Sequence, residues 1–268
     1  MKRFLLITFL TWLSVTCFGQ DEVKLEKVSD RFHYQYLKQE QSIEQIQQDN
    51  AERQRSWQEE FETMKAELDE GKRVSDNVKV NVLTDVQQLD DEINLIVTVS
   101  YETLTLEVAG DDYGLGKYTI QNSNACVFMC NFLKIKLESD LASYIKKGGK
   151  VDIKITGATD GTPIRSKIPY NGEFGDIQNK PITLNGKPFS MTVTKQTGIT
   201  NNGQLAFLRS QGVENYLKAK VEPLKQTQND FQIFAVENAE KGAGYRRVSV
   251  EITIHDAFDN VKPSNPEK

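Results

Sequence analysis

The chain has 268 residues and a formal net charge of −5, with 33 basic residues against 38 acidic ones. An acidic balance excludes the basic face or stripe of a nucleic-acid binder and is unsuited to electrostatic adhesion to anionic lipid. A neutral or zwitterionic ligand is compatible with this charge.

The first residues predict export. Two basic residues precede an apolar run from Phe4 to Val15, and small residues follow around Gly19. This pattern is typical of a secretory signal peptide over residues 1–19, which is too short to count as a membrane-spanning helix. Cleavage after Gly19 would make the chain more acidic still. The alternative is lipid attachment at Cys17, which would anchor the protein to a membrane.

A long polar helix is predicted over about residues 30–70, because neither Pro nor Gly occurs there before Gly71. Its apolar residues recur at gaps of three and four once a few polar positions are included, as in a coiled coil or a helix laid along a partner. We therefore assign residues 20–75 to a helical spacer, with a homodimer or an envelope protein as its partner. The alternative is a helix folded back on its own domain.

After Gly71 the hydrophobic pattern changes to period two, which predicts β-strands between residues 78 and 108. The later predicted elements are a helix from Ser123 to about Lys147, a strand over 150–156, a helix over 202–217, and strands over 231–236 and 247–254. This order predicts an α/β sandwich over residues 76–260, with helices on one face of a mixed sheet. A polar tail, 261–268, follows.

Two segments place opposite charges on neighbouring elements. Gly157–Asp160 (Gly-Ala-Thr-Asp) ends one predicted strand, and Arg209 lies in the helix that Asn202 opens. A carboxylate suits an ammonium group and a planar guanidinium suits a carboxylate, so Asp160 and Arg209 together are able to bind a zwitterion. Without ligand the two side chains could pair with each other, and a purely structural ion pair is the alternative.

These segments resemble the OmpA-like, peptidoglycan-associating domain family. Gly157–Asp160 resembles the family's Gly-His-Thr-Asp, and Asn202 to Arg209 aligns with its Asn-x-x-Leu-Ser-x-x-Arg, with Ala206 in place of Ser. Tyr245–Val248 resembles its closing Asn-Arg-Arg-Val. The resemblance covers about residues 115–256 and implies an OmpA-like α/β sandwich.

The resemblance also implies a function and a binding site. It implies non-catalytic, non-covalent binding of the peptidoglycan stem peptide, by a periplasmic cell-wall anchor or spacer that needs neither cofactor nor metal. Asp160 would accept hydrogen bonds from the ammonium of a diaminopimelate-type residue, and Arg209 would donate two to its carboxylate. Thr159 and Asn202 would add neutral hydrogen bonds. Arg246–Arg247 is interpreted first as structural.

Other interpretations of the same residues stay open. The fold could serve as a protein-binding module of an envelope complex. A cell-wall hydrolase is disfavoured, because neither His33 nor His255 neighbours a nucleophile motif and because carboxylates such as Glu173 lie in turns. Cys126 and Cys130 share one helix face and are predicted to be buried thiols, since a disulfide along a helix would be strained.

The two halves of the predicted site are separated by an insertion of about residues 161–200. Asn185–Gly186 is a two-residue type I′ turn signal between alternating segments, which predicts a β-hairpin. We hypothesise that the insertion covers the Asp160–Arg209 site and narrows the choice of ligand. The alternative is an extension of the sheet that has no contact with ligand.

Overall fold

The computed structural model describes residues 42–66, 78–89, 92–103 and 113–258. The predicted signal peptide, Cys17, the first part of the predicted spacer and the polar tail lie outside the described residues, as does His33. Within the described ranges, no helix is both long enough and apolar enough to span a membrane.

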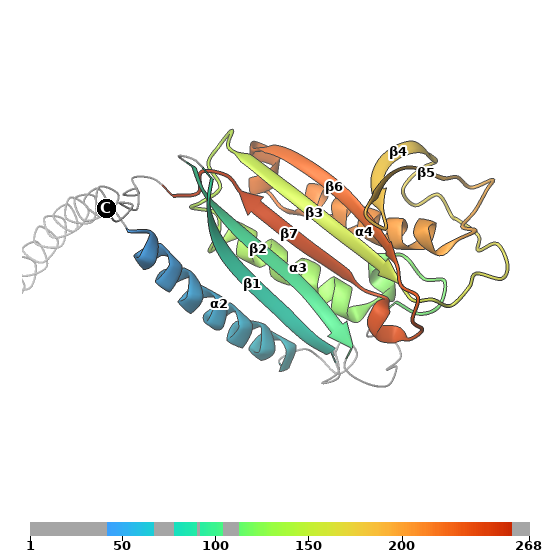
Figure 1. Ribbon diagram of the computed structural model, residues 1–268, viewed down its shortest axis with the longest axis horizontal. Helices are drawn as coiled ribbons and strands as arrows, with labels where there is room; N and C mark the ends of the chain where they lie inside the picture. Colours follow the sequence, from blue (N-terminus) through green and yellow to red (C-terminus); the bar gives the residue numbers. More distant parts are fainter. Residues whose placement is uncertain (1–41, 67–77, 90–91, 104–112, 259–268) are drawn as a thin grey trace, which may run out of the picture. The chain divides into compact units, whose positions relative to one another are not determined.

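The described residues form one mixed sheet with helices against it (Figure 1). In chain order the elements are α2 (Ile43–Ala66), β1 (Val78–Leu89), β2 (Glu92–Thr103), η1 (Ile120–Asn122), α3 (Asn124–Glu138), β3 (Lys150–Thr159), β4 (Ile177–Leu184), β5 (Lys187–Val193), α4 (Asn202–Lys220), η2 (Pro223–Gln226), β6 (Gln228–Glu237), η3 (Ala243–Tyr245) and β7 (Val248–Ile254). Each predicted strand and helix whose residues are described has a counterpart in this order.

The strand order in the sheet is β1-β2-β7-β3-β6-β4-β5. The β3–β6 and β4–β6 pairs are parallel and the other pairs are antiparallel. Helices α3 and α4 lie on the same face of this sheet (Figure 1), and every second residue of β7 is buried, as expected for a sheet covered on one side. The predicted α/β sandwich with an N-terminal helix is confirmed.

Local sequence signals explain where the helices begin and end. Ser123 accepts a hydrogen bond from the backbone N–H of Cys126 and so caps α3, as predicted. Asn201 caps α4 in the same way, accepting from the N–H of Gln204. Helix α3 is shorter than predicted. It ends at Glu138, where the Ser139 hydroxyl turns back to the carbonyl of Ile135 and competes with further helix.

The insertion contains the predicted hairpin. Asn185 and Gly186 both have positive φ, 49° and 77°, as a type I′ turn requires, and they join β4 to β5. Strand β4 pairs with β6 at Thr183 and Leu184, so the hairpin extends the main sheet and β5 forms its edge. This part of the insertion matches the alternative of a sheet extension.

Helix α2 is held against the domain over residues 47–66. Phe61 is fully buried, and its ring lies edge-on to those of Phe128 and Phe132 in α3, with ring centroids 4.6 and 5.0 Å away. Trp57 donates a hydrogen bond to Asp140 at 2.7 Å. This part of the predicted spacer is therefore folded back on its own domain.

Side chains of α2 take the place of a neighbouring strand along the edge strand β1. Gln54 accepts a hydrogen bond from the N–H of Thr84 at 3.0 Å, and Lys65 donates to the carbonyl of Val78 at 2.8 Å. Unpaired edge groups invite association with other strands, so these contacts protect the edge as well as hold the helix.

Replacing Gln54 with alanine should therefore lower the free energy of unfolding by about 1 kcal/mol, because the N–H of Thr84 loses its partner. Urea denaturation measures this difference. Gln48→Ala, an exposed position of the same helix, is the matched control and should change stability by less than about 0.5 kcal/mol. Equal effects of the two substitutions would show that the edge contact is not stabilising.

Candidate functional site

The predicted site lies where the carboxyl end of β3 meets α4. Gly157 allows this close approach, because a Cβ at this position would lie 2.1 Å from the carbonyl oxygen of Ala206 in α4. The first glycine of the Gly-Ala-Thr-Asp motif therefore has a packing role. It brings Asp160, just after β3, close to Asn202 and Arg209 of α4.

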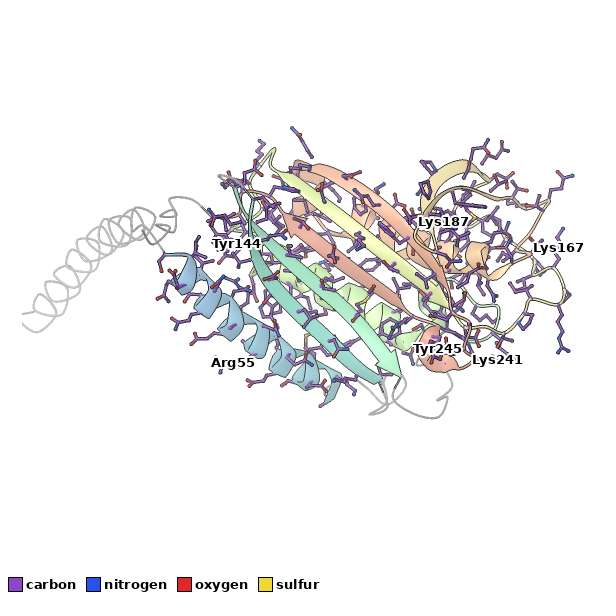
Figure 2. The ribbon with its side chains drawn as sticks, in the orientation of Figure 1. Arg55, Tyr144, Lys167, Lys187, Lys241 and Tyr245 are labelled. Carbon is purple, nitrogen blue, oxygen red and sulfur yellow. The ribbon has the colours of Figure 1, made fainter. Side chains whose placement is uncertain are left out.

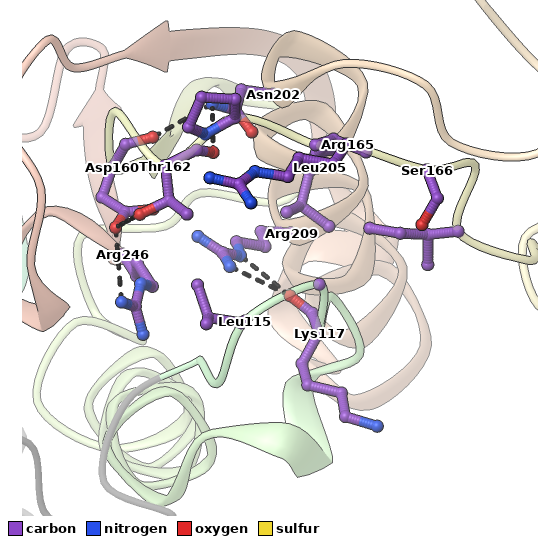
Figure 3. A pocket seen from close by; sticks show the side chains of 14 residues that line it. Leu115, Lys117, Asp160, Thr162, Arg165, Ser166, Asn202, Leu205, Arg209 and Arg246 are labelled. Carbon is purple, nitrogen blue, oxygen red and sulfur yellow. Dashed lines mark hydrogen bonds and ion pairs between the residues drawn. The ribbon is translucent and has the colours of Figure 1, made fainter.

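A cavity of about 340 Å³ opens at this junction (Figure 3). It is lined by Leu115, Gly116, Lys117, Asp160, Thr162, Pro163, Ile164, Arg165, Ser166, Ile168, Asn202, Leu205, Arg209 and Arg246. Three of the four residues predicted from the sequence, Asp160, Asn202 and Arg209, thus face one cavity. Its volume is at the lower end of the range typical of small-molecule sites, which suits one end of an amino acid.

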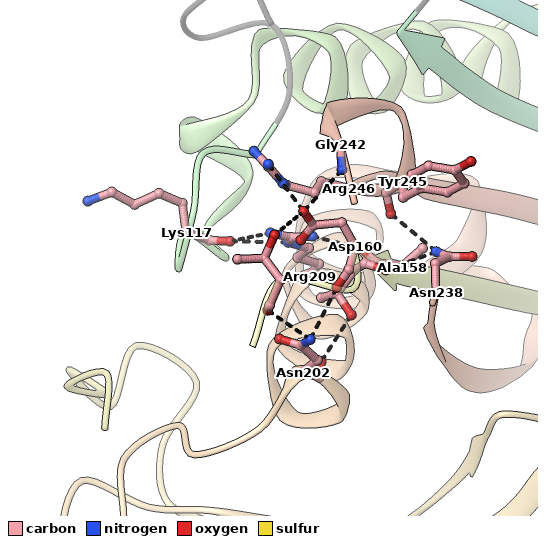
Figure 4. A network of polar contacts seen from close by, with 11 residues as sticks. Lys117, Ala158, Asp160, Asn202, Arg209, Asn238, Gly242, Tyr245 and Arg246 are labelled. Carbon is pink, nitrogen blue, oxygen red and sulfur yellow. Dashed lines mark hydrogen bonds and ion pairs between the residues drawn. The ribbon is translucent and has the colours of Figure 1, made fainter. Parts of the chain in front are cut away.

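Asp160 is nearly buried, with 4% of its surface exposed. Its Oδ2 atom accepts hydrogen bonds from the hydroxyl of Thr162 at 2.7 Å and the N–H of Gly242 at 3.2 Å, and pairs with Arg246 at 3.3 Å (Figure 4). Burial raises the pKa of the Asp160 carboxyl, but these donors together outweigh burial and hold the pKa below its usual value. Asp160 is therefore ionised at neutral pH, and its Oδ1 accepts no hydrogen bond from the described residues.

Asp160 and Arg209 do not pair with each other. The carboxylate of Asp160 pairs instead with Arg246, which lies just after η3. Arg209 donates from Nε and Nη2 to the carbonyl of Lys117, at 3.1 and 3.0 Å, and from Nη1 to that of Ala158, at 2.6 Å. The pairing that the sequence allows is therefore absent, because both side chains have other partners in the folded chain.

Arg209 forms the floor of the cavity but has 0% of its surface exposed. Burial lowers the pKa of Arg209 to about 10, so the guanidinium stays charged at neutral pH. Three of its five N–H groups are used by the two carbonyls, which leaves one on each terminal nitrogen. Because Arg209 has no exposed surface, a ligand would reach these two donors only after neighbouring side chains shift.

Asn202 and Thr159 hold the junction together. The Asn202 amide donates to the carbonyls of Asp160 and Thr162, both at 3.1 Å, and its Oδ1 accepts nothing from the described residues. Thr159 is 1% exposed and its hydroxyl contacts the carbonyls of Asn202 and Val236, at 3.5 and 3.4 Å. Asn202 is among the lining residues of the cavity, and Thr159 is not.

Sequence reasoning missed two arginines of the site. Arg246 was interpreted as structural. It is indeed paired in the interior, but it also lines the cavity, whereas its neighbour Arg247 is exposed. Alternation along a strand indicates that only one of two neighbours faces a site, and it does not indicate which one. Arg165 lies in the insertion, where no sequence pattern identifies it as a site residue.

The insertion divides into two parts. Its first residues, from Thr162 to Ile168, form a wall of the cavity, while the β4–β5 hairpin is absent from the lining. The hypothesis of a cover over the site therefore applies only to the first part.

The other candidate residues lie away from this cavity. Cys126 and Cys130 are buried and free, as predicted, and the hydrogen bond with Cys126 together with burial raises the pKa of Cys130. His255 pairs with Asp152 at 2.7 Å. In the part of the chain that the structure describes, no group of three His, Cys, Asp or Glu side chains is placed to hold a metal ion.

No protein-family model matches the chain, and neither does any curated protein sequence. Among solved structures, the chain is similar to the cell wall anchor of the T6SS from Pseudomonas aeruginosa, with 17% identity over 66% of this chain and 87% of that one and a TM-score of 0.27. It is also similar to a putative MotB like protein from Desulfovibrio vulgaris, with 14% identity, coverage of 83% and 99%, and a TM-score of 0.31.

A third similar structure is the OmpA-like domain of FopA1 from Francisella tularensis, with 13% identity, coverage of 65% of this chain and 80% of that one, and a TM-score of 0.24. An OmpA-like domain, the family that the sequence motifs resemble, is therefore among these structures. TM-scores this low support no further conclusion about this chain. The fold is established by the chain's own strand order and helices.

Proposed function

We propose that this protein is a non-catalytic cell-wall anchor of the periplasm, which holds the free end of a peptidoglycan stem peptide by non-covalent contacts. The observation that carries the proposal is a set of unused polar groups around one cavity. Asp160 Oδ1 and Asn202 Oδ1 are acceptors for an ammonium group, and the two remaining N–H groups of Arg209 are donors for a carboxylate. A diaminopimelate-type zwitterion presents both groups on one carbon.

The proposed location and anchoring follow from the first half of the chain. A signal peptide over residues 1–19 would export the protein, and Cys17 is the candidate for lipid attachment. We assign the role of spacer to residues 20–41, the first part of the predicted helical segment, and place self-association or an envelope partner there. Two sites on a dimer would retain it on the wall even if each bound weakly.

A protein-binding module is the second candidate, and one observation favours it. Arg209 has no exposed surface and Asp160 is already paired with Arg246, so both charged groups already have partners within the protein. A hydrolase has less support, because Asp160 is the sole carboxylate among the described residues that line the cavity, whereas acid–base cleavage of a glycan uses two.

Co-sedimentation with purified peptidoglycan sacculi tests the proposal. The protein should pellet with intact sacculi, and its bound fraction should fall to background when an amidase has removed the stem peptides from the glycan. Equal binding to bare glycan would contradict recognition of the stem peptide. A folded protein that stays in the supernatant with intact sacculi would favour the protein-binding module.

A further inference from the structure

The cavity carries more positive than negative charge. The guanidinium groups of Arg165, Arg209 and Arg246 line it, and Asp160 is its one carboxylate among the described residues. Asp160 is paired with Arg246. Lys117 contributes its carbonyl, and Figure 3 shows its ammonium pointing away from the cavity. Among the described residues of the lining, no further acidic group therefore balances the charges of Arg165 and Arg209.

Arg165 differs from the other two arginines in its surroundings. Its side chain is exposed, and it makes no hydrogen bond or ion pair with the described residues. In the view of Figure 3, the side chain extends toward the part of the cavity where Asp160 and Arg209 lie. A guanidinium without an acidic partner is able to bind a carboxylate through two parallel hydrogen bonds.

The backbone that carries Arg165 is fixed at both ends. On one side, Asn202 donates a hydrogen bond to the carbonyl of Thr162 at 3.1 Å. On the other, Ile168 and Ile199 exchange two backbone hydrogen bonds of 2.9 Å. Ile164 between them is partly buried against the core. The segment therefore presents Arg165 at a defined position, which a binding group needs.

We propose that Arg165 determines the specificity of this site by binding a second carboxylate of the ligand. The preferred ligand is then an amino-acid zwitterion with a further free carboxylate, and amidation of that carboxylate weakens binding. The inference rests on the proposed function. It adds that Asp160 and Arg209 hold the zwitterion while Arg165 donates paired hydrogen bonds to a separate acid group.

Titration calorimetry with meso-diaminopimelate and its monoamide tests this, because the two probes differ by one carboxylate. The wild-type protein should bind the diacid about tenfold more tightly than the amide, which corresponds to about 1.4 kcal/mol. In Arg165→Gln the two affinities should become equal, with the affinity for the amide unchanged. Lys167→Gln removes the same charge two residues away. The Lys167 side chain is exposed (Figure 2) and does not line the cavity, so this variant should keep the tenfold preference.

The outcomes separate this inference from the proposed function. Equal binding of both probes by the wild-type protein overturns the role of Arg165 and leaves zwitterion binding intact. A preference that persists in Arg165→Gln, or is lost equally in Lys167→Gln, also overturns the role of Arg165. Absence of binding to both probes overturns the proposed function and the inference with it.

Discussion

Replacing Gly157 with alanine should lower the free energy of unfolding by about 3 kcal/mol or more. The added Cβ would lie 2.1 Å from the carbonyl oxygen of Ala206 and 2.6 Å from the hydroxyl of Ser210. The first of these atoms belongs to the helix backbone, so it moves only with α4. Because α4 carries Asn202 and Arg209, binding to sacculi should fall together with stability. Urea denaturation and co-sedimentation measure the two effects.

Gly212→Ala is the matched control for this prediction. Gly212 lies in the same helix, and the nearest atom to an added Cβ would be Phe174 Cζ at 3.5 Å, an ordinary contact. The substitution should stabilise the protein by up to about 1 kcal/mol through helix propensity, and binding should not change. A Gly157→Ala protein as stable as the wild type would contradict the close contact between β3 and α4.

The sequence was informative wherever a local signal decides the structure. The Ser123 cap, the Asn185–Gly186 turn and the alternation along the strands each specify their own element without help from distant residues. The placement of Asp160 beside Asn202 and Arg209 also follows, because a strand end and the following helix start meet in such a fold. The resemblance to a known motif supplied the choice of these residues among many charged ones.

The partners within the site could not be predicted. Which group pairs with Asp160 depends on how η3 positions Arg246, and that depends on packing between segments distant in sequence. The same holds for Arg209, which binds carbonyls of Lys117 and Ala158 that any residue type would offer. The contact of α2 with its own domain was likewise left open, since an amphipathic stripe does not indicate which surface covers it.

Asp160→Asn should abolish binding to sacculi and lower the free energy of unfolding by about 3 kcal/mol. The variant keeps the size of the side chain but removes the carboxylate that pairs with Arg246 in the interior, where both side chains are 6% exposed. Removing one partner of a buried ion pair is costly, because the charge of the other partner stays buried. Urea denaturation at about pH 7 and co-sedimentation measure the two losses.

The double variant Asp160→Asn, Arg246→Gln separates stability from binding. Removing the second charge should restore much of the stability, so the double variant should be clearly more stable than Asp160→Asn alone. It should still fail to pellet with sacculi, since the acceptor for the ligand ammonium is uncharged. A stable double variant that binds like the wild type would contradict the role of Asp160 in ligand binding.

The dependence of stability on pH distinguishes an ionised Asp160 from a neutral one. Its pKa in the folded protein lies below the ordinary value of 3.8, so its stabilising contribution is complete above that value and is lost as the pH falls through the folded pKa.

The pKa of Glu214 is also lowered, since hydrogen bonds from Lys180 and Lys218 outweigh its burial. Glu214 is present in both proteins, so its effect cancels when wild type and Asp160→Asn are compared. The difference in unfolding free energy between wild type and Asp160→Asn should therefore be constant near neutral pH and shrink in acid. A difference that stays constant down to about pH 2 would mean that the charge of Asp160 does not stabilise the fold.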